Sequence, residues 1–415
     1  MPAASLSSLA VVLATAFVAR LLLGLAPRVR LPGVVLEIVL GIVIGPAVLG
    51  WAHADQPVAL LATLGVTFLL FLAGLEVDLA QYRGAIARLV GLGFLASLVL
   101  AVVAGETLAA LGVVRNPLLI AVALTATSLG LVVPVLGEAG VTATPLGRFV
   151  VASASLGDVG AVLALSLLFS RDTGSTSTRL VLLVAFAVAV VVITWSALHA
   201  GRSMRVSTLL VRLQDTTAQI RVRGALVLLV GLVVLAQHTG LETILAAFVA
   251  GAVIGFVDRD AMHTHPQFQV KLDAIGHGFL VPIFFVASGV RFDLRALTDH
   301  PAQLGRVPLF ALALLLVRGV PALLYRSHLG GRQVVAAGLL QATSLPFLVT
   351  AAMIGNEIGA LTNANAAALV GAGLLSALAF PVIAVTLLKG DATPGAVDAD
   401  DAESASGARP AVATS

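Results

Sequence analysis

The sequence consists largely of apolar stretches of about 17–25 residues, each long enough to cross the hydrocarbon core of a bilayer as a helix. Thirteen such stretches can be recognised along its 415 residues. Only 11% of the residues are charged, whereas soluble domains contain about 25%, so the charged side chains are too few to cover a water-facing surface. The chain is therefore predicted to be an all-α polytopic membrane protein. The predicted spans are 6–25, 33–50, 57–75, 86–112, 117–138, 146–169, 179–198, 222–239, 240–257, 272–290, 307–325, 333–355 and 363–388.

Lysine and arginine are distributed unevenly between the two sets of loops that thirteen spans define. Sixteen of these residues fall in one set and six in the other. Loops with an excess of Lys and Arg stay in the cytoplasm, so the first set is predicted to be cytoplasmic. The protein would then lie in the plasma (inner) membrane with its N-terminus outside and its C-terminus inside. The transmembrane domain covers residues 1–388, and residues 389–415, which contain few large apolar side chains, are predicted to form a disordered cytoplasmic tail.

Several functional classes lack their residues or motifs in this chain. There is no cysteine, which excludes disulfides, thiolate metal sites and cysteine nucleophiles. No GxGxxG or P-loop motif occurs between a strand and a helix, so neither a nucleotide partner nor a cofactor is predicted. The net charge of +3 arises from loops on one side of a membrane, so no nucleic acid partner is predicted. No nucleophile–base pair indicates an enzyme, and no metal is expected beyond a transported monovalent cation.

Short motifs recur in the two halves of the chain. Three of them return in the same order at offsets of 210, 215 and 216 residues: Gly41–Gly45 as Gly251–Gly255, Gly74–Leu79 as Gly289–Leu294, and Ala126–Leu129 as Ala342–Leu345. The shift equals seven spans, and an odd shift inverts the second copy in the membrane. Inverted-topology repeats over about 33–169 and 240–388 are therefore predicted, as in secondary transporters with a site near the midplane. The GxxxG pattern of the first motif is expected to pack helices closely within the bundle.

The fifth and twelfth spans are predicted to be discontinuous helices. Each has a Thr-Ser pair in mid-span followed by a proline, at Thr127-Ser128 before Pro134 and at Thr343-Ser344 before Pro346. Proline removes a backbone donor and clashes with the preceding turn. Carbonyl and hydroxyl oxygens are then free to bind a cation, and the half-helix dipoles point to the same place. The alternative for each segment is a kinked helix whose Thr and Ser side chains bond to their own backbone.

Two charged residues lie near the middle of predicted spans, Asp158 in the sixth and Arg318 in the eleventh. A charge at this depth costs about 2.5–3.5 kcal/mol on insertion scales, which suggests a functional role. Removal from bulk water favours the neutral form of a carboxyl group, whereas a bound Na⁺ or K⁺ favours the charged form. A proton and a cation are therefore expected to compete for Asp158. The alternative is a structural salt bridge between Asp158 and Arg318.

Oxygen ligands suit these hard cations, and several oxygen-bearing side chains are expected near Asp158. Ser155 lies one turn before it on the same helix face. The predicted proton- and cation-binding residues are Asp158, Thr127, Ser128 and Ser155. Charge compensation is assigned to Arg318, Thr343 and Ser344, and the secondary candidates are Glu37, Glu76 and Glu242.

Four motifs together resemble a known transporter family. They are Leu36–Pro46, Leu69–Asp78, Thr144–Arg148 leading to Asp158, and Pro282–Gly289. In these motifs the chain resembles the monovalent cation:proton antiporters, in particular the cation:proton antiporter-2 branch with its sodium/proton exchanger domain, over roughly residues 7–388. The resemblance implies thirteen helices, two crossed broken helices, a homodimer and elevator-like alternating access. It also implies that Asp158 binds the ion and that Arg318 occupies the basic position of the eleventh span.

The chain differs from the family pattern at three places. Many relatives have Asp, Asn or Gln where this chain has Gly157. Exchangers of the animal type have an acid at the position of Leu72, and many relatives have Gly-Glu at the position of Thr343-Ser344. The side chains around Asp158 thus offer fewer ligands than the family pattern does.

The function predicted from these observations is exchange of Na⁺ or K⁺ for H⁺ by alternating access. One carboxylate offers one charge per cycle, so an electroneutral exchange of one proton for one cation is expected. A second hypothesis is a sodium-coupled symporter for an organic anion, with Arg318 binding the anion. A third, suggested by the small number of ligands, is a transport-inactive membrane sensor or channel.

Overall fold

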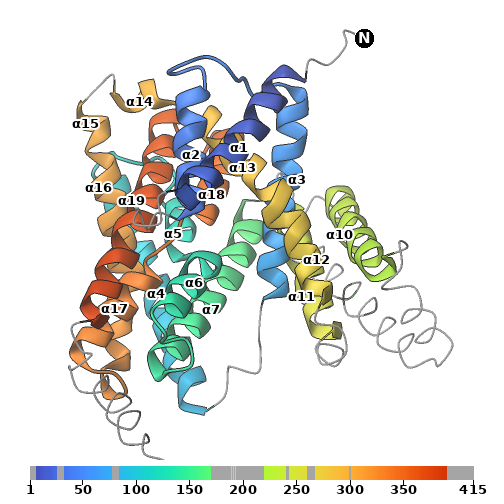
Figure 1. Cartoon of the computed structure of the whole chain (residues 1–415). Helices are drawn as coiled ribbons and strands as arrows, with labels where there is room; N and C mark the ends of the chain where they lie inside the picture. The colour runs from blue at the N-terminus through green and yellow to red at the C-terminus, as the bar shows by residue number, and fades with distance from the viewer. Residues whose placement is uncertain are drawn as a thin grey trace, which may run out of the picture.

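The computed structural model of the protein is a bundle of helices (Figure 1). It describes residues 6–25, 32–76, 84–169, 219–239, 243–258, 267–298 and 301–389, with Val188, Val190 and Val192. Within these ranges every regular element is helical. The elements are α1 (Ser7–Leu25), α2 (Gly33–Ile44), α3 (Gln56–Leu75), α4 (Gly84–Ala110), α5 (Pro117–Thr125), α6 (Leu129–Glu138), α7 (Pro145–Leu168), α10 (Ile220–Thr239), α11 (Thr243–Asp258), α12 (Gln267–Ile275), η2 (Gly276–Leu280), α13 (Val281–Val290), α14 (Leu294–Thr298), α15 (Pro301–Leu304), α16 (Arg306–Leu314), η3 (Leu315–Gly319), η4 (Val320–Ser327), α17 (Gly331–Gln341), α18 (Pro346–Glu357) and α19 (Asn363–Lys389).

Ten segments among the described residues are long and apolar enough to cross a membrane, and two further apolar helices, Gly33–Ile44 and Thr243–Val257, are shorter. They coincide with every predicted span except 179–198, which lies outside the described residues apart from three valines. The predicted tail after Lys389 also lies outside them. The prediction of 33–50 as one span was too long, because α2 ends at Ile44. Gly45 is extended there, with ψ 176°, as expected of a residue that precedes a proline.

The helices pack as two groups. The α3 group comprises α1, α2, α3, α10, α11, α12, η2 and α13. The α7 group comprises α4 to α7 together with α16, η3, η4 and α17 to α19. Figure 1 shows the α3 group on the side of the dark blue and yellow helices and most of the α7 group on the side of the teal and orange ones. Between the groups, α7 contacts α11 and α2 contacts α19.

Close glycine contacts hold the α3 group together in two helix pairs. In the α2–α13 pair, a Cβ atom on Gly41 would overlap the carbonyl oxygen of Val286, and Gly289 faces Gly41 in return. In the α3–α11 pair, a Cβ atom on Gly251 would overlap the carbonyl oxygen of Phe71. These contacts confirm that the GxxxG patterns pack helices within the bundle, where small residues let backbones approach closely.

Both predicted helix breaks are present. The fifth span is interrupted between α5 and α6 at 126–128, where Ala126 is extended, and the twelfth is interrupted between α17 and α18 at 342–345. Proline has a different position at each of the two breaks. Pro346 begins α18, where no backbone N–H is needed, but Pro134 lies inside α6, and the break precedes it.

We predict that Gly251→Ala lowers the free energy of unfolding by about 1–3 kcal/mol, because the added methyl group forces α11 away from α3. The measurement is the thermal midpoint of the protein purified in detergent. Gly231→Ala in α10 is the matched control, since a Cβ atom there meets no atom within 4 Å. Alanine should leave that midpoint unchanged or raise it through its higher helix propensity. Equal midpoints for the two variants would contradict the packing argument.

Candidate functional site

The two helix breaks touch each other at the centre of the α7 group. The backbone N–H of Ser128 donates to the carbonyl oxygen of Thr343 at 2.9 Å. The hydroxyl group of Thr127 donates to the carbonyl oxygen of Gln341 at 2.6 Å. Hydrogen bonds therefore join two segments that lie far apart in the chain. Thr127 and Gln341, for example, are 214 residues apart.

Asp158 lies on α7 beside this crossing. Its carboxyl group faces the backbone N–H groups of Thr127, which lies in the first break, and of Leu129, the first residue of α6. The N-terminus of a helix has a partial positive charge, so it favours an anion at this place. The side chain of Asp158 is partly exposed rather than sealed in. The structure thus brings the predicted carboxylate to the first break.

Arg318 lies inside the same region, in the π-helical segment η3, and is 1% exposed. Its Nε donates to the Thr127 hydroxyl at 2.8 Å, and one terminal nitrogen donates to the Ser153 carbonyl oxygen at 2.9 Å. The other terminal nitrogen donates to the Ser97 hydroxyl at 3.4 Å. Each nitrogen of the guanidinium is bonded to a neutral oxygen of the protein. These bonds connect η3 with α4, with the first break and with α7.

Asp158 and Arg318 are both described, and they are not joined by an ion pair within 4.0 Å. The two charges still interact at longer range. The structural salt bridge considered as the alternative is therefore not what the structure has. The carboxyl group of Asp158 is not held by Arg318 and can bind another group.

The remaining predicted site residues differ in their surroundings. The buried hydroxyl groups of Ser155 and Ser344 have no hydrogen-bond partner among the described residues. The Thr343 hydroxyl, in the second break, donates to the carbonyl oxygen of Leu339 in α17 at 3.1 Å. Thr127, whose hydroxyl is committed to Arg318 and Gln341, thus serves the crossing rather than offering a free ligand.

Four polar residues of this region were not predicted from the sequence, namely Ser97, Ser153, Gln341 and Ser376. Ser376 fastens the second break, because it accepts from the Ser344 N–H at 3.2 Å and donates to the Ser344 carbonyl oxygen at 2.9 Å. Ser153 donates to the Gln341 side chain at 3.1 Å. Gln341, a polar residue next to the repeated Ala-Thr-Ser-Leu motif, could have been recognised from the sequence. Single serines in apolar helices give no comparable signal.

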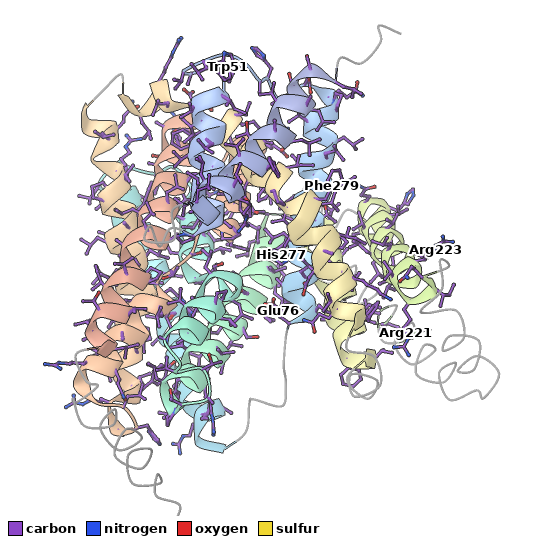
Figure 2. The ribbon with its side chains drawn as sticks, viewed as in Figure 1. Trp51, Glu76, Arg221, Arg223, His277 and Phe279 are labelled. Atoms are coloured by element: carbon purple, nitrogen blue, oxygen red, sulfur yellow. The ribbon has the colours of Figure 1, made fainter. Side chains whose placement is uncertain are left out.

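The secondary candidates are not part of the crossing, although the charge of Glu76 acts on Asp158 at longer range. Glu37 is 0% exposed and accepts from Arg20 at 2.9 Å, so it forms an ion pair between α1 and α2. Glu76 is exposed at the C-terminal end of α3, and Figure 2 shows it on the same side of the bundle as His277. Figure 2 also shows Trp51 at the opposite end of the bundle from Glu76. Glu242 lies outside the described residues.

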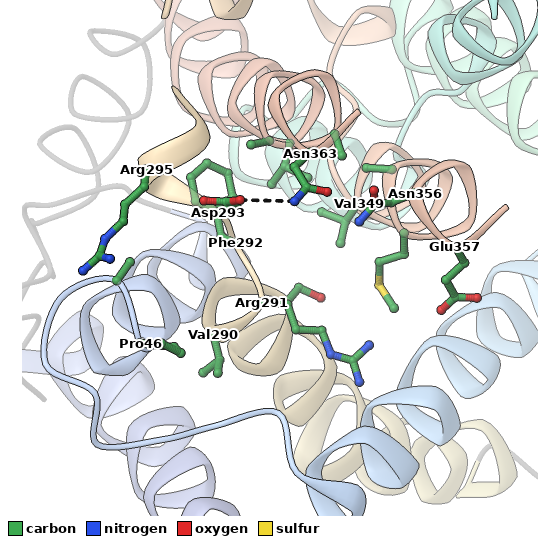
Figure 3. Close-up of a pocket in the computed structure, with 17 residues that line it drawn as sticks. Pro46, Val290, Arg291, Phe292, Asp293, Arg295, Val349, Asn356, Glu357 and Asn363 are labelled. Atoms are coloured by element: carbon green, nitrogen blue, oxygen red, sulfur yellow. Dashed lines mark hydrogen bonds between the residues drawn. The ribbon is translucent and has the colours of Figure 1, made fainter. Parts of the chain in front are cut away.

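A pocket of about 430 Å³ lies between the two helix groups, away from Asp158. Its walls come from the ends of α2 and α13 on one side and from α18 and α19 on the other. Figure 3 shows the hydrogen bond of 3.3 Å across it, from Asn363 of α19 to Asp293. None of the predicted site residues lines this pocket. The groups are thus separated by a space at one end of the bundle.

Comparison with known proteins identifies the family. The sodium/hydrogen exchanger family, defined on its transmembrane region, matches residues 13–390. The chain belongs to the sodium/hydrogen exchanger family. This exchanger-family chain is 29% identical over 412 residues to the putative Na⁺/H⁺ antiporter YjbQ of Bacillus subtilis, covering 94% of this chain and 64% of YjbQ. It is 27% identical over 372 residues to a Na⁺/H⁺ antiporter of Enterococcus hirae, covering 86% of this chain and 91% of that one.

A solved structure has the same fold. The sodium proton antiporter MjNhaP1 of Methanocaldococcus jannaschii aligns with a TM-score of 0.63 and 18% identity, over 92% of this chain and 98% of that one. The exchanger-family chain is therefore a multi-span membrane protein with the all-helical fold of that antiporter. The chain spans less than two thirds of the length of YjbQ.

We predict that Thr127→Val lowers the free energy of unfolding by about 1–3 kcal/mol, because it leaves a buried guanidinium nitrogen and a carbonyl oxygen without partners. Thr350→Val is the matched control, since the hydroxyl of this buried threonine bonds only within its own helix, to Pro346. The thermal midpoints of the two variants are compared in the same detergent. A control that is as unstable as Thr127→Val would show that the crossing bonds are not responsible.

Proposed function

We propose that the protein exchanges a monovalent cation, Na⁺ or K⁺, for protons across the membrane, with Asp158 as the group for which the two ions compete. The observation that supports this most is the carboxyl group of Asp158 facing the amides of the first break without an ion pair to Arg318. The hydroxyl of Ser155, which has no hydrogen-bond partner in the described part of the chain, lies one turn away on the same helix. Relatives include a Na⁺/H⁺-K⁺ antiporter, GerN of Bacillus cereus, at 29% identity over 287 residues.

The exchange follows from the charge of one side chain. A proton on Asp158 and a cation at Asp158 exclude each other, because each neutralises the same carboxylate. A site that opens to one side of the membrane at a time then releases one ion before it binds the other. Arg318 stays charged throughout, since guanidinium groups are effectively always protonated. One carboxylate thus gives an electroneutral exchange of one proton for one cation.

The two helix groups supply the means of alternating access. We propose that the α7 group, which contains Asp158 and both breaks, moves against the α3 group. The space between the groups at Asp293 and Asn363 supports a sliding interface rather than a fused core. The glycine-packed helix pairs of the α3 group support its role as the fixed part.

The proposed inverted repeats agree with the pairing of helices. Gly41 of the first half faces Gly289 of the second, and Gly251 of the second half meets the Phe71 carbonyl one turn from Gly74 of the first. Exchanging the two halves converts one pair into the other, as two inverted copies would require. Within the proposed domain of residues 1–388, the repeats are about 33–169 and 240–388.

We further propose a homodimer in the plasma membrane, with the N-terminus outside and the basic loops in the cytoplasm.

The structure disfavours the alternative of organic anion symport. Arg318, the residue expected to bind the anion, is buried and bonded on every guanidinium nitrogen to protein oxygens. An anion would have to replace these bonds. The third hypothesis, a transport-inactive sensor or channel, is separated from exchange by the experiment below.

We predict that the purified protein, reconstituted in liposomes with an acid interior and a pH-sensitive dye, dissipates the pH gradient when Na⁺ or K⁺ is added outside. Asp158→Asn should abolish the response, because an amide cannot bind and release the proton. Asp55→Asn is the matched control, since Asp55 caps α3 and asparagine caps equally well. A lack of response to every alkali cation, or full activity of Asp158→Asn, would overturn the proposal.

We also predict that the initial rate of exchange in these liposomes does not depend on an imposed membrane potential, because the cycle moves no net charge. The rate is measured at several potentials of both signs with identical ion concentrations. A rate that increased steadily with potential of one sign would overturn the one-to-one stoichiometry, although not the exchange itself.

A further inference from the structure

The residue before Asp158 is a glycine whose missing side chain leaves the space in which Arg318 sits. A Cβ atom built on Gly157 would lie 2.7 Å from Nη2 and 3.1 Å from Cζ of Arg318. It would also lie 3.1 Å from the carbonyl oxygen of Thr125. Neither neighbour can give way easily, because the guanidinium is bonded on all its nitrogens and the carbonyl is backbone. Any side chain at position 157 therefore displaces the guanidinium.

Neither backbone conformation nor helix stability explains this glycine. Gly157 lies in the middle of α7 and is not among the residues with a positive φ angle. Glycine within a helix costs about 1 kcal/mol relative to alanine, so α7 alone would favour alanine. The guanidinium bonds to the Ser153 carbonyl, the same oxygen with which an α-helix pairs the N–H of residue 157. The guanidinium thus lies directly over the glycine.

We propose that Gly157 is a positioning residue for ion exchange, which admits the charge of Arg318 against α7 next to Asp158. This inference rests on the proposed function. The few ligands expected around Asp158 then have a physical explanation. Position 157 offers no side-chain ligand, because the guanidinium of Arg318 takes up the space beside it.

A displaced guanidinium has a distinctive effect on exchange. A proton and a monovalent cation have the same charge, so Arg318 repels both from Asp158 equally. Moving it away from α7 strengthens the binding of both by one factor, roughly 1.5- to twofold for the shift of about 0.7 Å that relieves the Cβ contact, at an effective dielectric constant of ~20. At acid pH the apparent KM depends on the ratio of the two affinities and does not change. At alkaline pH it depends on the cation affinity alone and falls.

The test measures the apparent KM for Na⁺ in liposomes over a range of pH for wild type and variants. Gly157→Ala should lower the alkaline KM roughly 1.5- to twofold, leave the acid KM unchanged, and move the pH at which KM begins to rise upward by about 0.2–0.3 unit. Gly160→Ala is the matched control on the same helix, since the three atoms nearest to its Cβ atom all belong to the ring of Phe94. It should leave the pH dependence of KM unchanged, even where it lowers stability.

A second substitution makes the test independent of folding defects. Lysine at position 318 lacks the planar group that overlaps a Cβ atom at 157, so Gly157→Ala should have no further effect in an Arg318→Lys background. Should Gly157→Ala alone fail to fold, the double variant should fold and have the profile of Arg318→Lys. Additive effects, failure of both Gly157→Ala variants to fold, or an unchanged profile in a folded Gly157→Ala would overturn this inference alone. Full exchange by Asp158→Asn would instead overturn the proposed function on which it rests.

Discussion

A buried guanidinium, with no carboxylate within 4.0 Å among the residues that the structure describes, organises the centre of this protein. Removing a charge from water costs several kcal/mol unless its hydrogen bonds are replaced. Here they are replaced by two hydroxyl groups and a backbone carbonyl from three different elements. Arg318 thereby holds α4, the first break and α7 in one arrangement. Because its partners are neutral, this arrangement does not depend on the charge of Asp158.

The same geometry separates the structural role of Arg318 from the change of charge at Asp158. A salt bridge between the two residues would combine these roles. In a buried ion pair, protonation of the acid leaves the base unpaired, so every ion exchange would disturb the structure. With Arg318 bonded to neutral oxygens, the neighbouring carboxyl group can change its charge while the crossing of the two breaks persists. The longer-range attraction between the two residues still affects how readily Asp158 binds a cation or a proton. Arg318 therefore acts through the place of its charge beside α7. The missing side chain of Gly157 allows the charge to lie there.

The polar centre contrasts with the apolar packing of the α3 group. There the helices approach closely at glycines, where dispersion forces replace the hydrophobic effect that lipid cannot provide. Such contacts depend on shape and do not respond to ion binding. The structure thus places the crossing of the two breaks in one group of helices and the contacts of the repeated GxxxG motif in the other.

The sequence by itself determined the spans, because crossing a bilayer requires a local length of apolar chain that any window of residues reveals. It also located both breaks, through the repeated Thr-Ser pairs, and the mid-span carboxylate Asp158. It misassigned Pro134, since the first break depends on contacts with the second rather than on proline. Only the tertiary structure decided how these parts meet. The bond from Arg318 to Thr127 joins residues 191 positions apart, and the space at Gly157 is defined by a side chain from another helix. Such pairings leave no local pattern in the sequence, because they depend on which helices the fold brings together.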